Sequence, residues 1–83
     1  MILPTKGISP QRSLLAVAFQ VLDIADGVPA TVGAVWQRLL THRKQSGFDA
    51  PITFEWYVLA LDVLYALGMA QLSDDLLVVR RDG

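Results

Sequence analysis

The side chains that could support catalysis are few and widely separated along the chain. The 83 residues include a single histidine, His42, and no cysteine. A serine nucleophile would need His42 as its base, and no serine stands at a spacing from it that resembles a known arrangement. One histidine without cysteine cannot build the usual zinc site, and the glycines are too widely spaced for a phosphate-binding loop. The sequence therefore predicts no enzyme activity, no metal and no cofactor.

The carboxylates do not change this expectation. Six of the eight fall in three pairs, Asp23/Asp26, Glu55/Asp62 and Asp74/Asp75. Their expected positions are a helix end, a stripe along a helix and a turn, where acidic residues are ordinary. None of the pairs has a basic or metal-ligating companion close in sequence, so we interpret them as surface residues.

Phosphate binding is the remaining chemistry that the residue types allow. The candidate cations lie on the second predicted helix and after the last predicted strand: Arg38, Arg43, Lys44, Arg80 and Arg81. The net charge of −1 gives no overall attraction to nucleic acid or to anionic lipid. We therefore expect these residues to contact DNA weakly or indirectly at most, as an auxiliary to a larger assembly.

The apolar spacing predicts three helices. The first is expected to start with Ser9 as N-cap and Pro10 at its first position, and to run to about Ala25. Its predicted outer side carries Arg12, Gln20 and Asp23. The second is expected to begin after Thr31 and to end before Gly47, and the third to lie between Thr53 and Gly68, with the glycines as terminators.

A β-hairpin is predicted after the third helix. Two short apolar runs, 69–72 and 76–79, flank the polar residues 73–75, which are expected to form the turn. Three helices followed by a hairpin is the order of a winged helix, so the fold class is α+β, mostly α, in one winged-helix-like domain over residues 1–83. A plain three-helix bundle is the alternative. Residues 1–8 are expected to form an extended arm that lies along the hairpin or contacts a partner.

The third predicted helix is apolar on two opposed sides. Between Phe54 and Leu67 its charged residues are Glu55 and Asp62, seven apart and therefore on the same side. As the reading helix of a winged helix it would bring these carboxylates to DNA phosphates, which excludes ordinary base recognition. A helix that is apolar nearly all round must be buried nearly all round, which predicts a partner-binding surface. The residues expected to form that interface are Phe54, Trp56, Tyr57, Leu61, Leu64 and Tyr65.

The overall composition favours the same interpretation. Hydrophobic residues make up 53% and charged residues 18% of a chain near the lower size limit for a stable core. The excess of apolar residues indicates a surface buried in a complex, although an efficiently packed monomer is the alternative. No stretch approaches the roughly 18–20 apolar residues of a membrane span, and the N-terminal residues lack the pattern of a signal peptide. We expect a cytoplasmic protein.

Several segments together resemble a known family. They are the opening Met-Ile-Leu-Pro-Thr-Lys, the Ser-Pro pair before the first helix, Trp36-x-x-Leu39, and the block Trp56–Gly68 followed by a hairpin. In these segments the chain resembles the type six middle components of bacterial ABC-three-component systems. The resemblance implies a Lamassu-related phage-defence operon that combines an SMC- or Rad50-like ATPase, an effector that is often a nuclease, and a small linking subunit without catalytic residues.

The leading hypothesis is therefore a non-catalytic adaptor that binds the ATPase, the effector or both, without contact with a membrane. One alternative is a small winged-helix DNA-binding regulator, such as an antitoxin-like repressor, that uses the cations named above. Another is a self-associating structural domain without a larger partner.

Overall fold

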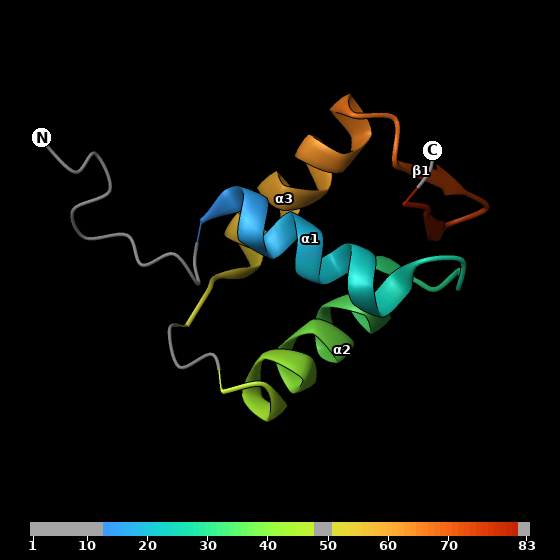
Figure 1. The fold of residues 1–83 in the computed structure, drawn as a ribbon. Helices are drawn as coiled ribbons and strands as arrows, with labels where there is room; N and C mark the ends of the chain where they lie inside the picture. The colour runs from blue at the N-terminus through green and yellow to red at the C-terminus, as the bar shows by residue number, and fades with distance from the viewer. Residues whose placement is uncertain (1–12, 48–50, 82–83) are drawn as a thin grey trace, which may run out of the picture.

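The computed structural model describes residues 13–47 and 51–81, which form three helices followed by a two-stranded hairpin. The helices are α1 (Leu14–Ala25), α2 (Val32–Gln45) and α3 (Phe54–Ala66), and the strands are β1 (Ala70–Ser73) and β2 (Leu76–Val79), as Figure 1 shows. This confirms the predicted element order. The predicted arm at residues 1–8 lies outside the described residues. None of the described helices has the length and hydropathy that a bilayer crossing requires.

Each helix begins at a hydroxyl side chain that caps its first turn. The hydroxyls of Thr31 and Thr53 accept the backbone N–H groups of Ala34 and Trp56, both at 3.1 Å, as the sequence predicted. The expected cap at Ser9 was wrong, because α1 begins at Leu14 and the Ser13 hydroxyl accepts the Ala16 N–H at 3.1 Å. Ser13 has extended backbone angles that suit an N-cap. Ser9 and Pro10 themselves lie outside the described residues.

The end of α3 depends on a left-handed glycine. Gly68 has a φ of +76°, which a side chain would disfavour. The reversal lets the Met69 N–H donate to the Leu64 carbonyl at 2.8 Å, so the chain leaves the helix and enters β1 directly. The predicted terminator is confirmed here.

The hairpin turn is tighter than predicted. Ser73 pairs with Leu76, which leaves a two-residue loop of Asp74 and Asp75 with φ values of +53° and +65°. Positive φ at both central residues is the type I′ geometry, whose twist matches that of the flanking strands. Aspartate tolerates this region better than most residues. Because Ser73 pairs with Leu76, it belongs to β1 and not to the turn.

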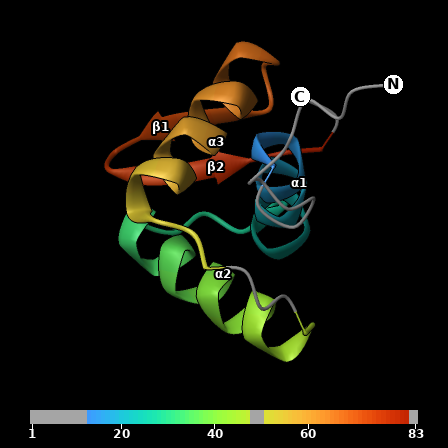
Figure 2. The same cartoon turned by 90° about the vertical axis from the view of Figure 1, so that its left-hand side faces the viewer.

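The connection between α1 and α2 is hydrogen-bonded to β2. Ala30 and Leu77 exchange two backbone hydrogen bonds of 3.2 and 2.7 Å, and the Gly27 N–H donates to the Val79 carbonyl at 2.9 Å. Figure 2 shows this connection running beside β2. Two isolated β-bridges, Asp26 with Val79 and Ala30 with Leu77, therefore tie the connection between α1 and α2 to β2.

Helix α1 lies between the other two helices and contacts both, with the larger contact to α3 (Figure 1). The core takes side chains from every element, and its largest fully buried members are Tyr57, Leu22, Leu39, Leu64, Leu77, Val17, Val21, Val35 and Val79. The Tyr57 hydroxyl donates to the Val32 carbonyl on α2 at 2.8 Å. Burial raises the pKa of Tyr57 to about 12, because the phenolate would lie in an apolar surrounding.

Candidate protein-interaction surface

The groups that could carry chemistry are dispersed over the described residues. No three His, Cys, Asp or Glu residues within 13–47 and 51–81 come together in a way that could hold a metal ion. His42 lies half-buried on α2 beside a shallow hollow between α1 and α2. Asp23 pairs with Arg81 at 2.6 Å, and Asp26 accepts the Arg81 backbone N–H at 3.1 Å, so both acids tie the C-terminal end of the hairpin to α1.

One face of α3 belongs to the core of the domain. Tyr57, Leu61 and Leu64, three of the predicted interface residues, are between 0% and 5% exposed, and Ala60 is buried beside them. This corrects the expectation for these three side chains, since they are already buried in the core of the domain and are not available to a partner. The fully buried residues of α3 therefore lie along one face of the helix, and not on two opposed sides as the sequence suggested.

The opposite face of α3 carries exposed and half-buried apolar side chains in two rows. Residues four apart on a helix form a ridge, and this face has one ridge of Phe54, Val58 and Asp62 and a second ridge of Glu55, Leu59 and Val63. Phe54 is 48% exposed and Leu59 is 45% exposed, while Val58 and Val63 are half-buried and pack partly against the core. We call these six residues the outer face of α3. Tyr65, 41% exposed, extends it beside the first ridge.

The N-terminal end of this face is held in place by aromatic contacts with α2. The ring of Trp36 lies edge-on to Phe54 with centroids 5.4 Å apart, and it lies 5.1 Å from the ring of Tyr57. Such pairs add about 0.5–1.5 kcal/mol beyond the area that they bury. A hollow lined by Phe54, Glu55, Val58 and Leu59, among others, opens on the outer face beside this cluster. Trp56, the remaining predicted interface residue, is half-buried at its edge.

A second apolar area, which the sequence did not indicate, lies on α1. Leu15 and Phe19 are one helical turn apart and about half exposed.

Gln20, which was expected on the outer side of this helix, is instead 6% exposed. The available signal was its spacing, since Gln20 follows Val17 by three and precedes Ile24 by four, and both neighbours face the core.

Gln20 is buried because it binds a buried arginine. Its Oε1 accepts a hydrogen bond of 2.8 Å from Arg43 on α2, whose side chain is 3% exposed. The burial lowers the pKa of the Arg43 guanidinium by desolvation. The structure thus corrects the expectation that Arg43 could contact phosphate, because this guanidinium joins α1 to α2.

The other predicted phosphate contacts are distributed over different elements. Arg38 and Lys44 are exposed on α2, and Arg80 is exposed after β2. Arg81 already pairs with Asp23. Of the five cations, one is therefore buried and one is ion-paired, and phosphate contact by the other three stays a prediction.

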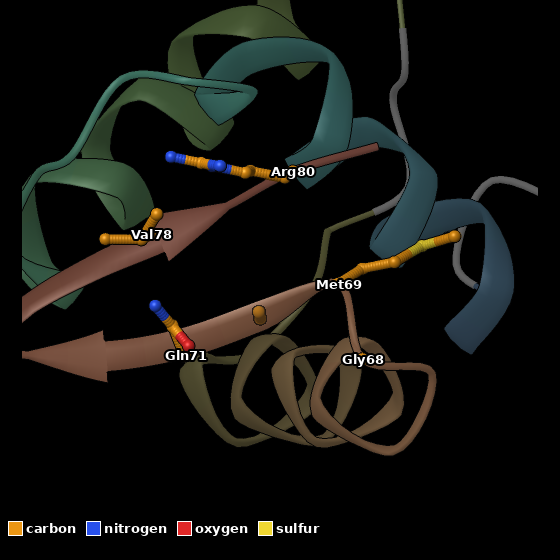
Figure 3. Close-up of a pocket in the computed structure, with 6 residues that line it drawn as sticks. Gly68, Met69, Gln71, Val78 and Arg80 are labelled. Atoms are coloured by element: carbon orange, nitrogen blue, oxygen red, sulfur yellow. The ribbon is translucent and has the colours of Figure 1, made fainter. Parts of the chain in front are cut away.

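A small hollow lies on the outward side of the hairpin and is shown in Figure 3. It has a volume of about 160 Å³ and is lined by Gly68, Met69, Ala70, Gln71, Val78 and Arg80. Gln71 on β1 and Val78 on β2 are paired across the strands and lie side by side in the figure. With one cation and one amide as its polar side chains, this hollow has no nucleophile and no acid–base pair.

Comparison with known proteins places the chain in one family. The family model for the ABC-three component system middle component 6 matches residues 3–81, nearly the whole chain. Neither the curated proteins nor the solved structures give a match. The comparisons therefore do not confirm the predicted winged-helix likeness, and the structure shows three helices followed by a two-stranded antiparallel hairpin.

Proposed function

Because the chain belongs to the family of ABC-three component system middle component 6 proteins, we propose that it is a non-catalytic adaptor subunit of an anti-phage defence complex. In this proposal it links an SMC- or Rad50-like ATPase to an effector, often a nuclease, encoded in the same operon. The complex is of the Lamassu-related type and acts in the cytoplasm. The adaptor helps to hold the effector inactive until the ATPase senses foreign DNA.

The observation that carries this proposal is the apolar outer face of α3. The opposite face of the same helix is already buried in the core of the domain, where Tyr57, Leu61 and Leu64 lie. Phe54, Leu59 and Tyr65 nevertheless remain between 41% and 48% exposed. Groups of large exposed apolar side chains on a small domain are typical of protein–protein interfaces.

The charges on the same face oppose the alternative of a DNA-reading protein. The outer face of α3 presents Glu55 and Asp62 where a major-groove helix would need donors. The burial of Arg43 removes one of the five cations that the alternative would use. A protein partner fits both features better than a nucleic acid does.

Co-expression with the neighbouring genes tests the proposal. The tagged full-length chain is expressed together with each product of its operon, and complexes are isolated at physiological salt. We expect a stable complex with the ATPase, the effector or both. Purification of the chain free of every operon partner would contradict an adaptor function.

A further inference from the structure

The outer face of α3 combines apolar side chains with two carboxylates that have no partner in the described structure. Glu55 and Asp62 are exposed, and no described cation lies within ion-pair distance of either. They stand at opposite ends of the two ridges, Glu55 at the start of one and Asp62 at the end of the other. Seven residues on a helix span about 10.5 Å, so the groove between the ridges has an apolar middle and a negative charge near each end.

We propose that this groove docks a helix of a partner subunit that carries two Lys or Arg residues seven positions apart on its own apolar face. The inference rests on the proposed adaptor function and specifies the chemistry of the partner. Ridges formed by residues four apart accept a ridge of a second helix between them. The apolar centre of that ridge contacts Val58 and Leu59, while its two cations lie opposite Glu55 and Asp62.

The same charges argue against a second copy of this chain as the occupant. In a two-fold symmetric dimer both copies use the same surface patch. With the two α3 helices antiparallel, Glu55 of each copy lies opposite Asp62 of the other, and with the helices parallel each acid lies opposite itself. Both arrangements bring four carboxylates into one apolar contact, where unpaired charges are costly. The face is therefore suited to a different, basic helix.

The partner's charge spacing also leaves its direction open. Two cations seven positions apart present the same pattern whether the partner helix runs parallel or antiparallel to α3. The charges then determine which helix binds. An equally apolar helix that carries acidic residues is repelled by Glu55 and Asp62, whereas a basic one is attracted.

The test uses the co-expressed complex of the full chain with its operon partner. The variant Glu55→Gln/Asp62→Asn removes both charges while keeping the shape and size of the side chains. We expect its Kd for the partner to rise about tenfold or more at physiological salt, because two charge pairs at a partly desolvated contact are lost. The Kd of the natural chain should rise with NaCl concentration, and that of the variant should depend on salt much less.

A matched control keeps the same change in net charge away from α3. Gln37→Arg/Gln45→Arg adds two positive charges to exposed positions on α2 and should bind with the natural affinity. A second variant, Leu59→Ser, should also weaken binding, because it interrupts the apolar centre of the groove. Circular dichroism establishes that each variant is folded as the natural chain is.

Three outcomes would overturn the inference in different ways. Natural affinity of the Glu55→Gln/Asp62→Asn variant for a partner that binds the natural chain would overturn the charge pairing and leave the adaptor function standing. A dimer of the natural chain that Leu59→Ser converts to a monomer would assign the face to a second copy. Failure of the natural chain to bind any operon product would overturn the adaptor function and this inference together.

Discussion

The same substitution at two tyrosines of α3 should have opposite consequences. Tyr57 is fully buried and Tyr65 is 41% exposed, although both belong to one helix and both were expected at an interface from sequence. Replacing each by aspartate puts a carboxylate either into the core or onto the surface. We expect Tyr57→Asp to unfold the domain and Tyr65→Asp to leave it folded but impaired in partner binding.

The magnitudes follow from the surroundings of the two side chains. Removing a large aromatic ring from a core costs about 3–5 kcal/mol. Loss of the hydrogen bond from the Tyr57 hydroxyl to the Val32 carbonyl costs about 1 kcal/mol more, and a buried carboxylate adds several. At about 0.05–0.15 kcal/mol per residue, a domain of this size has a free energy of unfolding near 4–12 kcal/mol. The cost of Tyr57→Asp is therefore as large as most or all of the free energy of unfolding, whereas Tyr65→Asp changes that free energy by about 1 kcal/mol or less.

Two measurements separate these effects. Urea unfolding followed by circular dichroism gives the free energy of unfolding of each variant, and co-purification with the operon partner reports binding. Tyr57→Asp should show no cooperative transition, while Tyr65→Asp should keep a cooperative transition with a midpoint close to the natural one and lose the partner. The control Tyr65→Phe should retain both properties, since it removes only an exposed hydroxyl.

The reasoning is refuted by either of two results. A Tyr57→Asp chain that unfolds at the natural urea concentration would show that this side chain does not lie in the core. A Tyr65→Asp chain that is folded and binds the partner with natural affinity would remove this edge of α3 from the interface.

Four further measurements test other parts of the structure. Tyr57 ionises at a higher pH in the folded state than in the unfolded state, so its contribution to the free energy of unfolding should be fully present below pH 10 and should be lost as the pH rises toward about 12. In Tyr57→Phe this loss with pH should be smaller, although the variant lacks one hydrogen bond and is less stable at neutral pH. Replacing Asp74-Asp75 by Asn-Gly should raise the free energy of unfolding by about 0.5–1 kcal/mol, because that pair suits two positive φ values, and a decrease would contradict the type I′ geometry. Gln20→Leu should cost about 1.5–3 kcal/mol by removing a hydrogen bond to a buried cation, and adding Arg43→Met should recover much of the loss; additive costs would argue against their coupling. Finally, footprinting of the isolated chain at physiological salt should reveal no defined DNA operator, and a protected site would favour the repressor alternative.

The elements that local chemistry determines were predictable from the sequence. Thr31 and Thr53 lie before helical apolar patterns and cap helices, and Gly68 ends α3. The start of α1 was missed because two serines, Ser9 and Ser13, both precede apolar residues at acceptable spacing. A capping pattern alone does not decide between two such candidates.

The features that depend on distant contacts were not predictable in the same way. The pairing of Ala30 with Leu77 joins residues far apart in sequence, and a Val-Pro-Ala connection has no pattern that indicates a strand. The burial of Arg43 depends on Gln20, 23 residues away on another helix. The core face of α3 could not be distinguished from its outer face in the sequence. Tyr57 and Tyr65 have the same side chain, and only the packing of the other elements in the fold buries one and leaves the other exposed.

The pairing of the 26–30 connection with β2 has a consequence for the order in which the domain folds. The helices require contacts between near neighbours, but the bonds from Gly27 to Val79 and between Ala30 and Leu77 close loops of about fifty residues, and loop closure of that length opposes folding entropically. Leu77 and Val79 also provide two fully buried core side chains. We therefore expect the docking of β2 to come late in folding and to add stability that the three helices lack without it.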